Sequence, residues 1–148
     1  MRHAADALQY PNHFPPTTRW KKFFIGVRWL GPDLSFFKDL KTQQAARHRD
    51  EMRVWGGGAR QEFAELLART LSQRLGWKST VFFPQDSLAV VCNGPRFDFI
   101  DDFALEKAML ILKKAHGVTV PRSFWNGKER CSFGDFIDEL VELKGRDC

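Results

Sequence analysis

Residues 101–117 read DDFALEKAMLILKKAHG. Apolar side chains recur through this stretch every three or four positions, which places them on one face of an α-helix. A carboxylate at Asp101 or Asp102 can cap the free amides at the helix start, and Gly117 can adopt the left-handed conformation that ends a helix after His116. The stretch therefore predicts a helix packed on a hydrophobic core. Its buried face would consist of Leu105, Ala108, Met109, Ile111, Leu112 and Ala115.

Three further stretches show helical periodicity. Residues 61–75 carry several leucines and Phe63 on one face and precede Gly76, a residue suited to a helix end. Residues 132–145 open with Ser132 and Asp135, which resemble a capping box, and end at Gly145. Residues 33–54 contain neither Pro nor Gly; their polar second half is expected to be solvated or to cover another surface with its side-chain stems. The predicted fold class is mainly α, a small helical bundle.

Two short apolar runs and a triple glycine interrupt the helical pattern. Residues 81–84 and 88–91 flank Gln85-Asp86-Ser87 and predict either an apolar loop or a pair of very short strands. Gly56-Gly57-Gly58 interrupts any helix, because residues without Cβ lose much chain entropy when they are ordered. We place the domain boundary there, with a basic aromatic extension containing one helix over 1–58 and the helical bundle over 59–148.

The chain has 148 residues, of which 43% are hydrophobic, and this is enough for one domain with a single core. No run reaches the roughly 18 to 20 apolar residues that a membrane-spanning helix needs, and the start lacks the apolar stretch of a secretory signal. A cytoplasmic location is therefore expected. Cys92, Cys131 and Cys148 offer neither a disulfide framework nor a zinc-binding spacing and are predicted to be free thiols.

Positive charge is concentrated in the first part of the chain. Residues 1–60 carry 11 Lys and Arg against 5 Asp and Glu, whereas residues 61–148 carry 12 against 13. Residues 19–30 mix these cations with Trp and Phe, a combination that suits an anionic membrane surface or nucleic acid; in another interpretation the aromatic residues simply pack on the bundle. Arg47, Arg49 and Arg53 extend the positive region, which also suits an acidic protein partner. The basic residues concerned are Lys21, Lys22, Arg28, Arg47, Arg49 and Arg53.

The order of these segments resembles an acyl or peptidyl carrier protein over residues 59–145. A helix ending in Leu75-Gly76 is followed by a long loop, an acidic helix start, the phrase AHGVTVP at 115–121 and the phrase SFGDFI at 132–137. In that family the second helix ends in a phrase similar to FGIxIP, and the last helix opens with one similar to TVGDLI. The resemblance implies a small bundle that docks onto other proteins.

Two departures from the family concern the prosthetic group. Carrier proteins attach phosphopantetheine to a serine at the start of the second helix, in a Gly-x-Asp-Ser-Leu phrase. Counted back from residues 118–121, that position falls at 101–103, where Asp102 cannot accept the arm. A literal Asp86-Ser87-Leu88 lies earlier, in the long loop, and makes Ser87 the alternative attachment site. The resemblance therefore implies a degenerate carrier that holds no cofactor.

Other chemistry-bearing residues have simpler explanations. Asp101, Asp102 and Glu106 could act as acid and base or hold a metal ion, but capping and complementarity to the helix dipole explain them without a metal motif. His116 could serve Cys92 as a base beside a nucleophile, but contact with the last carbonyls of its own helix is sufficient. No catalytic residue and no metal site are predicted.

The sequence hypothesis is a non-catalytic protein-binding or adaptor protein. Its basic first part and the acidic start at 101–102 would present oppositely charged surfaces to protein partners. The alternatives are a functional carrier modified on Ser87 and a peripheral binder of anionic membrane or nucleic acid. The expected contact residues are Lys21, Lys22, Arg28, Arg47, Arg49, Arg53, Asp101 and Asp102.

Overall fold

The computed structural model describes residues 6–9, 36–93, 103–125 and 131–146, and it is mainly helical, as predicted. Within these ranges there is no strand, and one isolated bridge joins Ser87 to Ser132. No helix in the described ranges is long and apolar enough to cross a membrane. In chain order the elements are α2 (Phe36–Ala45), the 3-10 helix η1 (Arg49–Trp55), α3 (Gly58–Leu75), α4 (Leu88–Asn93), α5 (Phe103–His116), the 3-10 helix η2 (Arg122–Trp125) and α6 (Phe133–Arg146).

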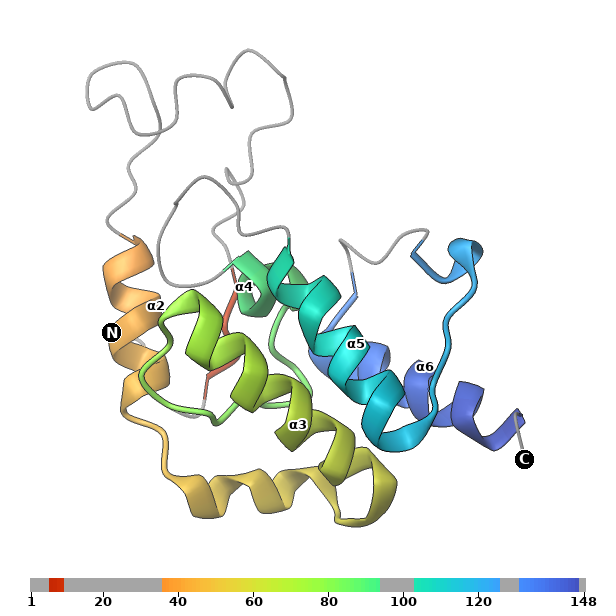
Figure 1. The fold of residues 1–148 in the computed structure, drawn as a ribbon. Helices are drawn as coiled ribbons and strands as arrows, with labels where there is room; N and C mark the ends of the chain where they lie inside the picture. Colours follow the sequence, from red (N-terminus) through yellow and green to blue (C-terminus); the bar gives the residue numbers. More distant parts are fainter. Residues whose placement is uncertain (1–5, 10–35, 94–102, 126–130, 147–148) are drawn as a thin grey trace.

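Helix α3 is the centre of the bundle, and α5 and α6 pack against it (Figure 1). Phe63, Leu67 and Leu71 of α3 are fully buried, which confirms the face predicted over 61–75. On α5 the predicted face is only partly confirmed, because Leu112 is buried whereas Ala115 is exposed. The α5 start predicted at 101 or 102 lies outside the described residues.

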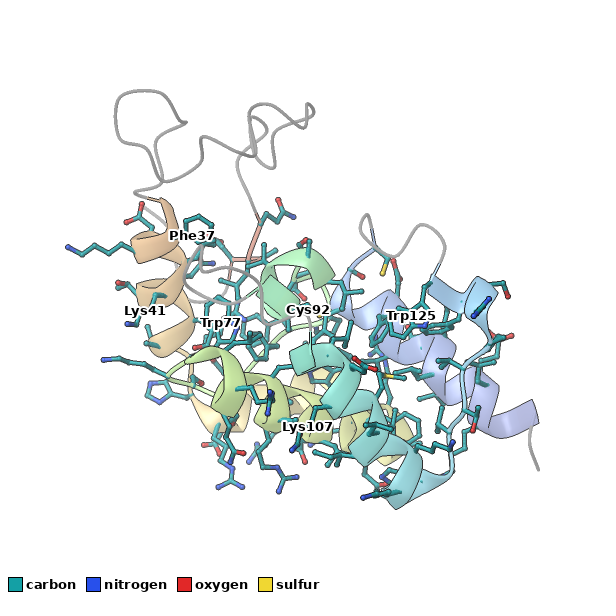
Figure 2. The ribbon with its side chains drawn as sticks, turned by 45° about the horizontal axis from the view of Figure 1, so that its top comes forward. Phe37, Lys41, Trp77, Cys92, Lys107 and Trp125 are labelled. Carbon is teal, nitrogen blue, oxygen red and sulfur yellow. The ribbon has the colours of Figure 1, made fainter. Side chains whose placement is uncertain are left out.

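Aromatic side chains fill the space between η1, α6 and the segment that follows α3. The Trp55 ring packs edge-on to Phe133 with 5.4 Å between centroids, and Phe82 packs edge-on to Phe133 and to Trp77 at 6.0 and 5.6 Å. Trp77 lies among the helices (Figure 2). The Trp55 indole N–H also donates a hydrogen bond to the Phe82 carbonyl at 2.8 Å. Residues from both sides of the triple glycine therefore contribute to one core.

The triple glycine forms the turn between η1 and α3. Gly56, Gly57 and Gly58 all have positive φ, at 81°, 76° and 65°. Residues with a Cβ rarely adopt this conformation, so three in succession favour glycine at each position. Helix α3 therefore begins at Gly58, three residues before its predicted start. It ends as predicted at Gly76, which has a φ of 83°.

The continuous helix predicted over 33–54 is wrong. Helix α2 ends at Ala45, and helical geometry resumes only at Arg49. Between them His48 is extended, with φ −96° and ψ 144°, and its N–H donates to the Glu51 carboxylate at 3.0 Å. Arg47, next to this break, is buried and pairs with the Asp86 carboxylate. The absence of Pro and Gly was therefore not sufficient to keep residues 46–48 helical.

The two short strands considered for residues 81–84 and 88–91 do not form. Val81 and Phe82 are buried in irregular backbone, which confirms the alternative of an apolar loop. Residues 88–93 instead form α4, in which the Val91 N–H donates to the Ser87 carbonyl at 3.1 Å. Leu88 and Val91 lie one helical turn apart and both are buried, so a helix satisfies the same apolar pattern.

Three helix boundaries were predicted in the last part of the chain, the end of α5 and the start and end of α6. The first two are confirmed. Gly117 follows α5 with a φ of 72°. Ser132 caps α6, since its hydroxyl accepts a hydrogen bond from the Asp135 N–H at 3.1 Å. Helix α6 continues past Gly145 to Arg146, so Gly145 does not end it.

The loop before α4 binds the first turn of α6 through backbone hydrogen bonds. The Phe133 N–H donates to the Asp86 carbonyl at 2.7 Å, and the Gly134 N–H donates to the Pro84 carbonyl at 2.8 Å. The two backbones approach so closely that a Cβ on Gly134 would lie 2.7 Å from the Pro84 Cβ. Free amides at this helix start are therefore satisfied by the loop, and glycine is needed for the contact.

Candidate functional site

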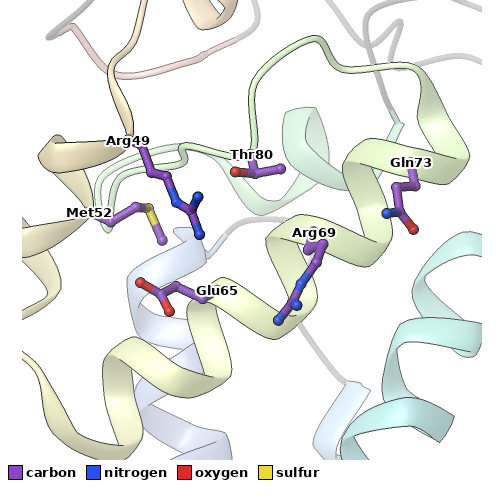
Figure 3. A pocket seen from close by; sticks show the side chains of 6 residues that line it. All are labelled: Arg49, Met52, Glu65, Arg69, Gln73 and Thr80. Carbon is purple, nitrogen blue, oxygen red and sulfur yellow. The ribbon is translucent and has the colours of Figure 1, made fainter.

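A pocket lies between η1, α3 and the segment that follows α3 (Figure 3). Its volume is about 580 Å³. Met52 is 4% exposed and gives the pocket an apolar patch, whereas the other lining residues are exposed and polar. The lining residues are Arg49, Met52, Glu65, Arg69, Gln73 and Thr80.

Helix α3 supplies one wall of the pocket. Glu65, Arg69 and Gln73 follow one another at four-residue spacing, so they form a single stripe along the helix. Leu67 and Leu71 lie between them in sequence and are fully buried. Burial of the leucines therefore turns the polar stripe toward the pocket.

Helix η1 supplies the other wall. Trp55 anchors it, with only 1% of the residue exposed, and Met52 is buried one turn earlier. Arg49, at the first position of η1, points with Glu65 toward the space between η1 and α3 (Figure 3). Arg53 is exposed on the same short helix but does not line the pocket.

The pocket carries two guanidinium groups that are available to a ligand. Among the described residues, no carboxylate forms an ion pair with Arg49 or Arg69. Glu65 accepts a hydrogen bond from the Gln61 amide at 3.0 Å. Guanidinium groups present a planar fork of donors that matches carboxylate and phosphate groups. The pocket can therefore bind an anionic group of another molecule, with Glu65 limiting the negative charge it accepts.

The prediction that Arg47 contacts a partner is wrong, because its side chain is fully buried against Asp86. Arg47 Nη1 lies 2.6 Å from Asp86 Oδ2, and Nη2 lies 3.0 Å from Oδ1. The same carboxylate accepts the N–H groups of Leu8 at 2.8 Å and of Phe83 at 2.7 Å. A buried charge requires such partners because removing it from water is costly. The ion pair therefore joins the segment between α2 and η1 to the loop before α4.

The helical spacing of the sequence is consistent with a buried Arg47, although it does not identify Asp86 as its partner. Phe37, Leu40, Gln44 and Arg47 continue one helical spacing, although the last two are polar. Gln44 is fully buried; its amide nitrogen donates to the Ser79 carbonyl, and its amide oxygen accepts the Ser79 N–H at 3.0 Å. Gln44 and Arg47, two polar residues that continue an apolar helix face, are therefore the sequence signal of this buried hydrogen-bond network.

Ser87 lies directly before α4, and so at a helix start and not within a long loop as predicted. The residue is half-buried. Its N–H donates to the Leu8 carbonyl at 2.8 Å, and its carbonyl accepts the Val91 N–H. The bridge to Ser132 brings it to the start of α6. Ser87 is therefore held between residues 6–9 and α6.

Most of the remaining predicted contact residues fall outside the described ranges, as does the whole of the aromatic segment 19–30. Glu106, from the predicted acidic cluster, is exposed in the first turn of α5. The predicted contact residues that lie outside the described ranges are Lys21, Lys22, Arg28, Asp101 and Asp102.

The described contacts do not join His116 to Cys92. The His116 ring lies 4.8 Å from the Phe63 ring, and its Nδ1 lies 3.5 Å from Lys144 Nζ. Cys92, on α4 (Figure 2), instead interacts with Cys131. Burial, and secondarily the charge of Cys131, raise the pKa of the Cys92 thiol to about 12. This thiol is protonated at neutral pH and is therefore a poor nucleophile.

Within the described ranges, no three His, Cys, Asp or Glu side chains gather in a way that could hold a metal ion. Comparison of the chain with protein-family models, with curated proteins and with solved structures finds no match.

Proposed function

We propose that this protein is a binding or adaptor protein that takes an acidic segment of a protein partner at the η1–α3 pocket. The observation that carries the proposal is the pair of exposed guanidinium groups, Arg49 and Arg69, without an ion-pair partner among the described residues. Carboxylates of the partner pair with the two arginines. An apolar side chain of the partner contacts Met52, which lines the pocket and is 4% exposed.

The charge pattern around the pocket favours a protein segment over a polyanion. Glu65 lies in the pocket wall, and Asp50 and Glu62 are exposed on η1 and α3. Nucleic acid and anionic membranes present continuous negative charge, which these carboxylates repel. A protein segment can place its own carboxylates at Arg49 and Arg69 and another residue at Glu65.

The expected affinity is modest and depends on salt. An exposed ion pair contributes about 0.2–1 kcal/mol, so two of them change the Kd by at most about thirtyfold. Their larger effect is on partner choice and association rate. Binding weakens as salt rises, because the screening length falls to about 3 Å at 1 M ionic strength.

Fluorescence anisotropy with a labelled peptide rich in Glu and Leu tests this proposal. The double variant Arg49→Glu with Arg69→Glu is expected to lose binding, and Arg49→Lys is expected to retain part of it. The matched control is Lys107→Glu with Lys114→Glu, which makes the same change of charge at exposed positions of α5. Equal loss in both double variants, or tighter binding of an oligonucleotide or of anionic vesicles than of the peptide, would contradict the proposal.

We further propose that residues 59–145 are a degenerate carrier-like bundle, which makes the adaptor role non-catalytic. The support is the order of α3, α5 and α6, with Gly117 in left-handed conformation before residues 118–121 and Ser132 capping the start of α6. Intact-mass measurement of the protein from its native source tests this. A mass equal to that of the bare chain is expected, and a covalently added prosthetic group would contradict it.

A further inference from the structure

Residues 6–9 lie between α2 and the loop that precedes α4 (Figure 1). The Leu8 N–H donates to the Asp86 carboxylate at 2.8 Å, and the Leu8 carbonyl accepts the Ser87 N–H at 2.8 Å. The Leu8 side chain is 0% exposed. The loop therefore binds both backbone groups of Leu8, and the Leu8 side chain belongs to the hydrophobic core.

Helix α2 and the residues that follow it bind the same segment two residues earlier. The Asp6 carbonyl accepts hydrogen bonds from Gln43 Nε2 at 2.7 Å and from Arg47 Nη2 at 2.8 Å. Backbone groups of residues i and i+2 point to the same side when a chain is extended, which matches contacts at residues 6 and 8. We call the site formed by Gln43, Arg47, Asp86 and Ser87 the Leu8 groove.

The Leu8 groove binds mainly backbone atoms and therefore selects few side chains of the segment that it holds. Four of its contacts go to the backbone of the bound segment, and the side chain that it buries fully is Leu8. Asp6 and Gln9 are exposed. Peptide-recognition sites work in this way, because backbone hydrogen bonds give general affinity and one pocket selects the side chain.

The groove also holds hydrogen-bonding capacity that the segment does not use. Gln43 is buried, and its Oε1 has no hydrogen-bond partner among the described residues. Gln43 Nε2 donates to the Asp6 carbonyl. Oε1 belongs to the same amide group and therefore also lies near the bound segment. A buried acceptor without a partner carries the full cost of lost hydration. A peptide that placed an additional N–H donor there would gain a hydrogen bond that the chain's own segment does not provide.

We propose that the Leu8 groove is a peptide-binding site that residues 6–8 fill within the same chain, and that a partner protein fills it with an extended segment carrying Leu. The incoming segment supplies the donor that Gln43 Oε1 lacks. When the groove is empty, the Ser87 N–H and the Gln43 amide lose their hydrogen-bond partners, and the empty state is therefore costly. One peptide is accordingly expected to replace another without leaving the groove empty.

Exchange by a free peptide tests the proposal on the full chain. The probe is a fluorescent peptide with the sequence of residues 4–11, AADALQYP. The receptor is the Leu8→Asp variant of the full chain, in which the segment cannot bury its anchor. This variant is expected to bind the probe at least about tenfold more tightly than the wild type, where the tethered segment competes at an effective concentration on the order of millimolar.

Matched probes show whether the leucine directs binding. A Leu8→Asp probe is expected to bind at least about tenfold more weakly, because a buried leucine is replaced by a charge. A Leu8→Met probe keeps an apolar side chain of similar volume and is expected to bind like the original. A Gln43→Ala receptor is expected to bind the probe several-fold more weakly, because the Asp6 carbonyl loses one of its two donors.

A second experiment does not require the Leu8→Asp variant to fold. A protease site placed within residues 10–35 of the wild-type chain is cut after folding, so that residues 6–9 remain bound without a tether. Excess labelled probe is then expected to replace the cleaved fragment. Failure of the probe to enter both the variant and the cleaved protein would overturn the proposal, as would equal binding of the Leu8→Asp probe. Concentration-dependent dimerisation of the wild type that Leu8→Asp abolishes would assign the groove to a second copy and overturn the assignment to a partner protein.

Discussion

Arg47 and Asp86 form a two-point ion pair with both side chains fully excluded from solvent, although 39 positions separate them in the chain. The same carboxylate accepts the N–H groups of Leu8 and Phe83. The Arg47 guanidinium carbon also lies 4.0 Å from the centre of the Phe83 ring. Residue 8, the segment between α2 and η1, and the loop before α4 therefore meet at one carboxylate, which belongs to the Leu8 groove.

Asp86→Ala is expected to lower the free energy of unfolding by about 3–5 kcal/mol, because Arg47 stays buried without a counter-charge. Urea denaturation followed by circular dichroism measures the change. The matched control is Asp138→Ala, which removes the exposed ion pair between Arg60 and Asp138, whose side chains are 36% and 53% exposed. That control is expected to cost no more than about 1 kcal/mol.

The double variant Arg47→Met with Asp86→Leu separates charge pairing from the other bonds of the carboxylate. It is expected to remain well below the wild type in stability, because the N–H groups of Leu8 and Phe83 lose their acceptor whether or not Arg47 is present. Full recovery of stability in the double variant would show that Asp86 serves only to neutralise Arg47.

Gly134→Ala is expected to destabilise the protein by about 1–3 kcal/mol. The added Cβ would lie 2.7 Å from the Pro84 Cβ and 2.8 Å from the Pro84 carbonyl oxygen, so the loop must move away from α6. Gly145→Ala in the same helix is the control, since no atom lies within 4 Å of its added Cβ. Helix propensity predicts that this control stabilises the protein by up to about 1 kcal/mol. Thermal unfolding of both variants measures the two changes in Tm. Equal changes in Tm would contradict the close contact between Gly134 and Pro84.

Alkaline pH is expected to weaken the fold through Cys92. Burial raises the pKa of its thiol from 9.0 to about 12, so between these values the unfolded chain releases a proton that the folded protein retains. Stability must therefore fall as pH rises above about 9, by up to about 1.4 kcal/mol per pH unit. Urea titrations at several alkaline pH values measure the fall. The Cys92→Ala variant is expected to show a smaller one, and an identical fall would exclude Cys92 as its source.

Ser87 is expected to remain unmodified when the protein is incubated with a phosphopantetheinyl transferase and coenzyme A. The residue is half-buried, its N–H is bonded to the Leu8 carbonyl, and a bridge joins it to Ser132, so residues 6–9 and the start of α6 restrict the access of an enzyme to it. Intact-mass spectrometry provides the measurement. A mass increase that is absent from the Ser87→Ala variant would reinstate the alternative of a working carrier.

Local sequence patterns predicted the helices whose signals lie within a few residues. The leucine spacing of α3, the left-handed Gly76 and Gly117, and the Ser132 cap were all predicted correctly. The patterns failed where a partner far along the chain decides the conformation. His48 leaves helical geometry between α2 and η1, next to an arginine whose carboxylate partner is 39 residues away.

The candidate site shows the same division. Arg49 could be named from charge alone, because exposed cations follow from composition and position in the chain. Arg69 could not be assigned to the same site, because it belongs to a different helix and meets Arg49 only when α3 packs beside η1. Arg47 shares the charge of both and yet is buried, and no local pattern of charge distinguishes it from them.

By itself the sequence determined that this protein is mainly helical, where α3 and α5 end, where α6 begins, and which of its parts is basic, because periodicity, capping and charge act within a few residues of one another. Only the tertiary structure decided which cations face solvent, that residues 6–9 bind beside Asp86, and that η1 and α3 enclose a pocket. These features depend on groups brought together from distant parts of the chain, whose contacts form only when the core is packed.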